Sequence, residues 1–290
     1  MSQTLEAPSD GCKDWPICQK VADLYNSGAR LFTKEDLEDI EDQLRQSSTM
    51  KRFLVRRLDG NITRISNPYF RDQNPIWKPF VDYKGYWQLV KENSDGPTKT
   101  SLCPYTVDWI KKTNQTFLPQ PMQVFDEKRL WWQNSKTCRH LTALIKDVLC
   151  GRTVKKVVCF GLGEFSRTLP QWLKDEFKSW DEEDDVRHAT SSMIQHSMAL
   201  TIAQLARASD NEMLPLLTQD PEYSKTTEDI LIEKGFKIVG SHGAAGFAEV
   251  DDDSIVISAF PDAPIKQIIA ELARPVVFIT TDFSDFNDDG

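Results

Sequence analysis

The sequence predicts an α/β protein with a Rossmann-like, mostly parallel sheet of strand order 3-2-1-4-5, preceded by an irregular α+β elaboration. Three observations support this class. Short apolar runs alternate with amphipathic helical patterns in the C-terminal half. Parallel strands need crossovers, which are right-handed and favour this strand order. The first run, residues 154–160, ends in a glycine turn with the sequence GLG. We therefore expect a disordered segment at residues 1–14, a helical and hairpin elaboration at residues 15–150 packed on the core, and a Rossmann-like domain at residues 151–290.

The N-terminal half begins with a helix and a hairpin. In "FTKEDLEDIEDQL", Thr33 is placed as the N-cap, and Leu37, Ile40 and Leu44 recur at helical spacing. Asp59-Gly60 between two alternating runs indicates a β-hairpin turn. Residues 67–125 are rich in proline and aromatic residues, and we expect an irregular wrap with short helices there.

The remaining elements follow in order along the chain. "SKTCRHLTALIKDVLCGR" predicts a helix that Gly151 terminates. Apolar runs predict strands, and the patterns between them predict helices. The expected strands are 154–160, 214–218, 236–239, 254–260 and 275–282, and the expected helices are 187–208, 222–235 and 263–273.

Composition excludes several classes of function. The net charge of −9 and the pI near 5.1 argue against a nucleic-acid partner, which needs clustered basic residues. No apolar run approaches the length of a membrane helix, and the first residues lack the pattern of a secretory signal, so we expect a cytoplasmic or nuclear protein with no membrane partner. The six cysteines show neither a CxxC pair nor zinc spacing, so we expect reduced thiols and no metal site. Nothing in the sequence indicates an oligomeric state.

The glycine turn marks the expected ligand pocket. Gly161 and Gly163 allow a sharp turn and a close backbone approach to a ligand. Ser166 stands where the third glycine of the dinucleotide fingerprint would fall, and an insertion at 167–186 replaces the helix that should follow, so NAD is not favoured. A ligand pocket beside the strand and a plain glycine turn both remain open. The inserted Trp172, Phe177 and Trp180 predict either a lid over the strand ends or an anchored surface helix.

Polar residues after the other strands complete the candidate site. Asp220 follows the second strand, where an acid either binds ribose hydroxyls or caps the next helix. His242 and Asp262 follow the third and fourth strands, and with Glu164 they are candidate acid–base groups. His196 lies mid-helix and is expected to be a core or surface residue with satisfied hydrogen bonds rather than a catalyst. We assign ligand contacts to the following residues: Gly161, Gly163, Phe165, Ser166, Asp220 and Tyr223.

Four stretches together resemble the sensitivity-to-red-light-reduced family, whose members carry an SRR1-like domain: "VVCFGLGEFS", "QHSMALTIAQL", "LLTQDPEYSKTTEDILIEKGFKIV" and "IVISAFPDAP". Two upstream stretches, "CPYTVDWIKKTNQTFLP" and "RLWWQNSKTCRHL", are similar to its fungal branch in particular. By this resemblance the family's glycine turn falls on Gly161 and Gly163, with Phe165 after it, and its Asp-Pro pair falls on Asp220 and Pro221. Its Met-Pro-His-Cys-Pro stretch falls on residues 260–264.

That last stretch departs from the family pattern, because Asp262 and Ala263 replace the family's histidine and cysteine. Any haem binding or chemistry that those two residues carry in relatives is therefore not expected here in the same form. The family is linked to light and circadian signalling, to haem metabolism and to cytoskeletal stability. The resemblance thus implies a regulatory role without naming a reaction.

Three functions follow as hypotheses. The first is an intracellular regulatory protein that binds a nucleotide-like or other small ligand in the cleft at the carboxyl ends of the strands. The second is a biosynthetic enzyme using the same cleft, either similar to an S-adenosylmethionine-dependent methyltransferase or acting as a cofactor-free lyase or hydrolase. The third is an interaction scaffold. S-adenosylmethionine and nucleotides are the candidate ligands.

Overall fold

The computed structural model of the 290-residue chain describes residues 16–72, 76–91, 98–111, 116–169, 174, 181–207, 214–259 and 262–280. The predicted disorder at residues 1–14 lies outside this range, as do Trp172, Phe177 and Trp180 of the expected lid.

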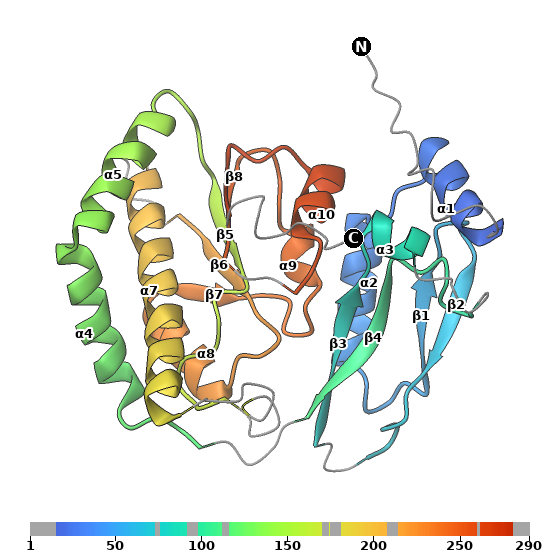
Figure 1. Ribbon diagram of the computed structural model, residues 1–290, viewed down its shortest axis with the longest axis horizontal. Coiled ribbons are helices and arrows are strands. Elements are labelled where there is room, and N and C mark those ends of the chain that lie inside the picture. The colour runs from blue at the N-terminus through green and yellow to red at the C-terminus, as the bar shows by residue number, and fades with distance from the viewer. Residues whose placement is uncertain are drawn as a thin grey trace.

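A five-stranded parallel sheet forms the centre of the C-terminal half (Figure 1). Its strands are β5 (Lys156–Phe160), β6 (Leu216–Gln219), β7 (Phe236–Ile238), β8 (Ser254–Ser258) and β9 (Val277–Thr280). They lie in the order β7-β6-β5-β8-β9, which is 3-2-1-4-5 when these strands are counted along the chain, and every neighbouring pair is parallel. The predicted α/β class with a parallel sheet is confirmed.

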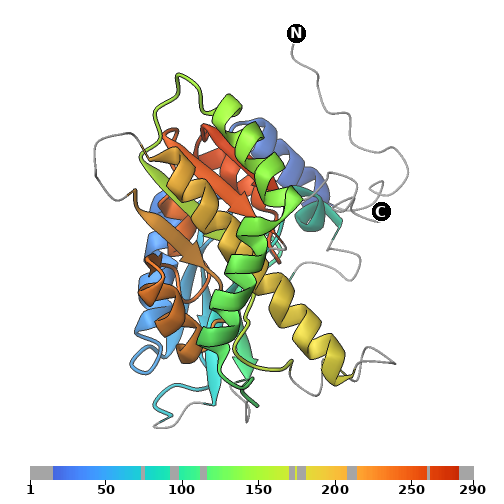
Figure 2. The ribbon, with the colours of Figure 1, turned by 90° about the vertical axis from the view of Figure 1, so that its left-hand side faces the viewer.

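Alternate residues of the strands face two different hydrophobic clusters. Val157 and Cys159 of β5 pack with helices on one face, which are α4 (Pro121–Asn134), α5 (Lys136–Val148), α7 (Glu182–Ala206) and α8 (Lys225–Glu233). Figure 2 shows α4, α5 and α7 as the outer layer on this side. Val158 and Phe160 face the opposite side, toward α2 (Lys34–Arg45), α9 (Ala245–Ala248) and α10 (Ile265–Leu272). Helices therefore cover both faces, as continuous apolar strands require.

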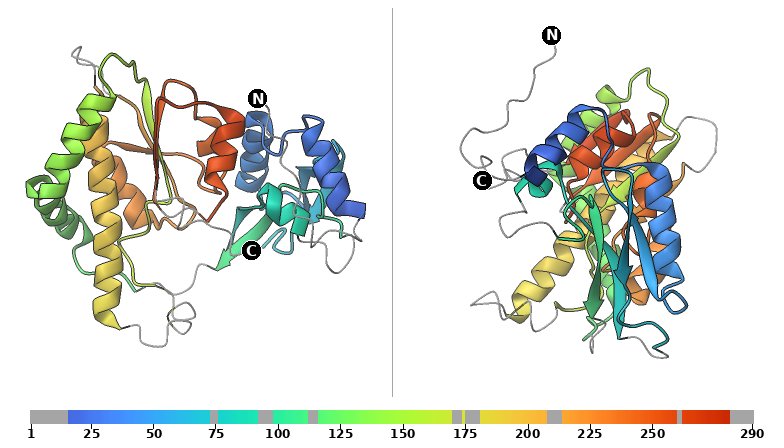
Figure 3. Two further views of the ribbon diagram at one scale, coloured as in Figure 1. Left: turned by 45° about the horizontal axis from the view of Figure 1, so that its top comes forward. Right: turned by 90° about the vertical axis from the view of Figure 1, so that its right-hand side faces the viewer.

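The N-terminal half confirms the predicted helix and hairpin. Thr33 is the N-cap of α2, and its side chain accepts a hydrogen bond from the Asp36 backbone N–H. Strands β1 (Arg52–Arg56) and β2 (Ile62–Ser66) pair antiparallel around the Asp59-Gly60 turn. Helices α1 (Pro16–Asn26) and α3 (Tyr86–Lys91) complete this half beside the hairpins (Figure 3).

The expectation of an irregular wrap over residues 67–125 is wrong for two segments of that range, which form paired strands. Strands β3 (Trp77–Tyr83) and β4 (Tyr105–Lys111) pair antiparallel over seven residues each. Pro79 is tolerated within β3 because its nitrogen, which has no hydrogen to donate, faces away from β4. Val81, two residues later, donates its N–H to the His242 carbonyl rather than to β4, so the Pro79 nitrogen also faces away from the ladder.

The two halves share one core. Phe32, Leu37 and Ile40 from the N-terminal half belong to the same buried cluster as Phe160 and Val256 of the sheet. The N-terminal elaboration thus forms one layer of the sheet's own packing, which places β3 and α3 next to the carboxyl edge of the sheet.

Candidate functional site

The glycine turn after β5 packs against α7. Gly161 and Gly163 have φ of 60° and 86°, in the left-handed region that favours glycine. A Cβ atom on Gly163 would lie 2.3 Å from the Ser192 Oγ atom of α7. The left-handed backbone and the close approach of Ser192 both favour glycine here, whether or not a ligand binds.

Asp220 lies directly against this turn, as the two strand ends predict. Its Oδ2 atom accepts a hydrogen bond from the Gly163 N–H at 3.0 Å, and its Oδ1 atom accepts one from the Glu222 N–H at 3.0 Å. Burial raises the pKa of the Asp220 carboxyl to about 6, partly offset by these two hydrogen bonds. The Gly163 N–H that could donate to a phosphate is thus already bound to a protein carboxylate.

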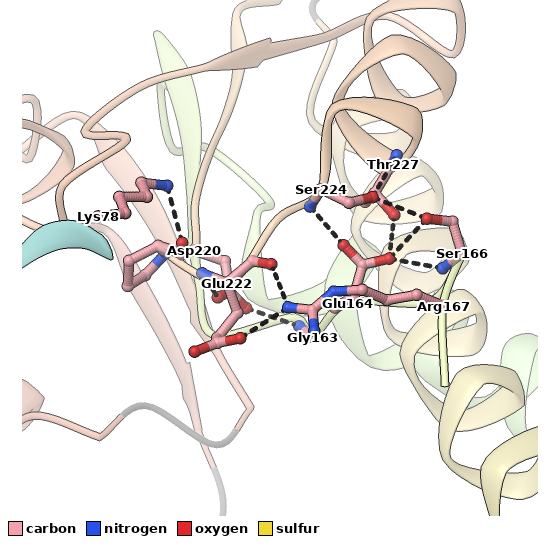
Figure 4. Close-up of polar contacts among 10 residues, drawn as sticks. Lys78, Gly163, Glu164, Ser166, Arg167, Asp220, Glu222, Ser224 and Thr227 are labelled. Atoms are coloured by element: carbon pink, nitrogen blue, oxygen red, sulfur yellow. Dashed lines mark hydrogen bonds and ion pairs between the residues drawn. The ribbon is translucent and has the colours of Figure 1, made fainter. Parts of the chain in front are cut away.

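A second carboxylate, that of Glu164, occupies the N-terminus of α8 (Figure 4). Its Oε2 atom accepts from the Ser224 N–H at 2.5 Å. Its Oε1 atom accepts from the Ser166 N–H at 2.6 Å and from the Thr227 hydroxyl at 2.5 Å. An anion is stabilised at a helix N-terminus, and here the protein supplies that anion itself. Glu164, a candidate acid–base group, has a structural position instead.

Three further predicted ligand contacts lie inside the protein, and two of them belong to the turn. The Ser166 hydroxyl is fully buried and bonds to Glu164 and Ser224. Phe165 is fully buried, and its ring contacts Phe125 at a centroid distance of 5.3 Å. The structure gives both side chains protein partners because the turn packs down onto α8 and α4.

Tyr223, the third of them, is held by a buried hydrogen-bonded chain. Its hydroxyl lies 2.8 Å from His196 Nε2 and 2.9 Å from Thr218 Oγ1, so it too has protein partners. His196 Nδ1 lies 2.7 Å from the Ser192 carbonyl, so Nδ1 carries the proton and Nε2 accepts from Tyr223. Burial lowers the pKa of His196 to about 4. His196 is a neutral core residue, so of the core and surface positions that the sequence left open the structure has the core.

His242, the predicted general base, connects the two halves of the molecule. Its Nδ1 atom donates to the Pro79 carbonyl of β3 at 2.7 Å. Its backbone carbonyl accepts from Val81 and its N–H donates to Glu41 Oε1 at 2.9 Å. Burial lowers the pKa of His242. Nδ1 and both backbone groups therefore bind protein partners, which holds the ring beside β3 and α2 and leaves Nε2 as the unprotonated ring nitrogen.

Sequence reasoning missed Glu41, which is 1% exposed. Its Oε2 atom accepts from the N–H groups of Ala244 and Ala245, at 3.0 and 3.2 Å. The signal was present, because Glu41 follows Leu37 by four residues and so falls on the buried stripe of α2. A lone acid on an apolar helix face indicates a buried polar contact.

Sequence reasoning also missed Arg167, which lies near Glu164 and Glu222 in Figure 4. Its Nη2 atom donates to the Glu222 carbonyl at 2.9 Å and to its carboxylate at 2.7 Å. Its Nε atom is buried and has no hydrogen-bond partner within the described part of the chain. Lys78 of β3 donates to the Pro221 carbonyl at 2.8 Å, which brings the N-terminal half to this edge.

Asp262 lies apart from this network, on a hollow of about 360 Å³. The hollow lies between the start of α3 and the N-terminus of α10, and aromatic side chains, the Asp262 carboxylate and Lys266 line it. The Asp262 side chain is exposed, and no described residue bonds or ion-pairs with it. The aromatic residues that line the hollow are Tyr83, Tyr86 and Trp87.

Two other kinds of site are absent from the described residues. These residues contain no cluster of three histidine, cysteine, aspartate or glutamate side chains that could hold a metal ion. No helix among them is long and apolar enough to cross a membrane.

Comparison with known families gives one match. Residues 141–290 match the family model of the SRR1 domain, which is 150 of the 290 residues. The chain belongs to the SRR1 family. The SRR1 region contains the whole parallel sheet, the glycine turn and Asp262, whereas Tyr83 and Trp87 on the opposite wall of the hollow precede it. No curated protein and no solved structure gave a significant match.

Proposed function

We propose that this SRR1-family protein is a regulatory protein that binds a small organic molecule at the carboxyl edge of a Rossmann-like sheet. Family membership supports the regulatory role. The hollow between α3 and α10 carries the proposal for the binding site, because ligand pockets are concave and combine aromatic walls with a few polar groups.

The contacts of the glycine turn support assigning the ligand to the hollow rather than to the turn. Its two anion positions, the Gly163 N–H and the N-terminus of α8, are filled by Asp220 and Glu164. A pyrophosphate would have to displace buried carboxylates from both positions, which argues against NAD. We therefore assign the ligand to the hollow, where Asp262 is accessible, and assign the turn to fixing the sheet edge.

A thermal-shift panel tests this proposal. Purified full-length protein is screened with nucleotides, S-adenosylmethionine and haem, and co-purified molecules are identified by mass spectrometry. We expect at least one ligand to raise the melting temperature, and the shift to disappear in Trp87→Ala. The control is Trp131→Ala, whose side chain is 64% exposed on α4 and should leave the shift unchanged. A panel without any Trp87-dependent shift would overturn the proposal.

The alternative function is an enzyme whose active site is the same hollow, and one observation supports it. Of the three acid–base candidates, Asp262 is the one that lines the hollow, and its side chain is exposed. The Glu164 carboxylate is bound to protein groups, and His242 lies beside Pro79 of β3. An enzyme would convert its ligand, and Asp262→Ala would abolish product formation while the melting temperature stays unchanged. Recovery of the bound ligand unaltered after incubation would count against this alternative.

A further inference from the structure

We infer that the hollow takes a small organic cation, with an ammonium or sulfonium group against the rings of Tyr86 and Trp87 and near the Asp262 carboxylate. This inference rests on the proposed function and adds the chemical class of the ligand.

The aromatic wall is held in place before any ligand binds. Tyr86 and Trp87 pack edge to face, with ring centroids 4.9 Å apart and an interplanar angle of 72°. Tyr25 of α1 contacts the Tyr86 ring at 4.8 Å, and the Tyr86 N–H donates to Gln267 Oε1 at 2.9 Å. Tyr83 is fixed by its hydroxyl, which donates to the Gly243 carbonyl at 2.9 Å. Such preorganised rings attract cations through the negative potential of their faces.

The Asp262 carboxylate supplies negative charge at the hollow. Asp262 is exposed and has no bonded partner among the residues described. Nearby Asp82 of β3 has its pKa raised chiefly by burial, and the surrounding charges act in both directions, since Lys84 lowers this pKa and Asp108 and Asp262 raise it. The exposed Asp262 carboxylate is therefore the group on the hollow that would attract a cation.

An opposing charge also lines the hollow. Lys266 is on the first turn of α10, whose N-terminus carries a partial positive charge. These two features would favour an anion, so the experiment must separate ligand charge from ligand shape.

A matched pair of probes does so. Choline and 3,3-dimethylbutan-1-ol have the same shape, and the second carries a neutral carbon in place of the charged nitrogen. We expect isothermal titration calorimetry of the full chain to give choline an affinity about tenfold higher. S-adenosylmethionine and S-adenosylhomocysteine form a second pair, in which only the first has a positive sulfonium. The same preference is expected there.

Substitutions identify the residues that cause the preference for the cationic probe. Asp262→Asn should weaken choline binding by about three- to tenfold and leave the alcohol unchanged, because only the charge is removed. Trp87→Phe keeps a ring and should retain most of the affinity, whereas Trp87→Ala should lose it for both probes. Asp229→Asn, an exposed acid on α8, is the control and should change nothing.

The outcomes separate the two proposals. Equal binding of choline and its neutral analogue overturns the cation inference and leaves the hollow as a binding site. Failure of both choline and S-adenosylmethionine to bind also overturns it. In that case, an anionic ligand whose thermal shift depends on Trp87 would still support the proposed function. If no such ligand were found, both the cation inference and the proposed function would be overturned.

Discussion

The Glu164 carboxylate accepts a hydrogen bond of 2.5 Å from the Ser224 backbone N–H, sixty residues further along the chain. This contact closes the loop after β5 onto the start of α8. Ser224 also caps α8, since its hydroxyl accepts from the Thr227 N–H. The edge of the sheet that usually presents open N–H groups to a phosphate is thereby closed by the protein.

Replacing Glu164 tests this closure. Glu164→Gln should lower the free energy of unfolding by about 3 kcal/mol, because a buried amide cannot accept all the hydrogen bonds that the carboxylate accepts. Urea denaturation measures the loss. Glu233→Gln on the exposed side of α8 is the control and should stay within about 0.5 kcal/mol of the wild type. Equal effects of the two substitutions would contradict the structural role of Glu164.

Alanine substitutions at two glycines with similar backbone conformations distinguish the cost of backbone strain from the cost of a steric clash. A Cβ atom on Gly151 (φ 73°) would have no atom within 4 Å, whereas one on Gly163 (φ 86°) would meet Ser192. Gly151→Ala should cost about 1 kcal/mol of stability, and Gly163→Ala about 3 kcal/mol. Thermal unfolding compares them. Adding Ser192→Ala to Gly163→Ala should recover part of the loss, and no recovery would mean that Ser192 is not the obstacle.

His196 should make the stability depend on pH. Burial lowers its pKa to about 4 in the folded state, below the ordinary 6.5 of the unfolded chain. The unfolded state therefore binds the proton first, and the stabilising contribution, complete above pH 6.5, is lost as the pH falls toward 4. The loss approaches about 3 kcal/mol.

Urea titrations at pH 7, 6, 5 and 4 check this dependence. In His196→Gln, which does not titrate, the difference in unfolding free energy from the wild type should shrink across this range. His140→Gln, at an exposed position on α5, should keep the wild-type slope. A slope unchanged in His196→Gln would show that the histidine does not titrate as its burial implies.

The shared core predicts that the C-terminal half needs the N-terminal half. Without residues 1–150, Val158, Phe160 and Val256 of the sheet lose their partners from α2 and the hairpins. Residues 151–290 expressed alone should bind a hydrophobic dye and lack a cooperative thermal transition, unlike the full chain. A cooperative transition in the isolated half would contradict the shared core.

Local patterns in the sequence determined the alternating elements and several of their ends. The apolar runs indicated the five strands, Thr33 marked the start of α2, and Asp59-Gly60 marked the hairpin turn. These features depend on residues that are close in sequence, so periodicity and capping chemistry suffice. The four motifs likewise indicated the SRR1 family.

Only the tertiary structure decided what the polar residues at the sheet edge do. Glu164, His242 and Tyr223 follow strands or begin helices, as ligand-binding residues do, yet each bonds to a group at least five residues away in sequence. Sequence spacing does not reveal such partners, because they depend on which segments pack together. The same packing brings Trp87 from outside the SRR1 region to face Asp262 across the hollow, a pairing of positions 175 residues apart (262 − 87) that no local pattern encodes.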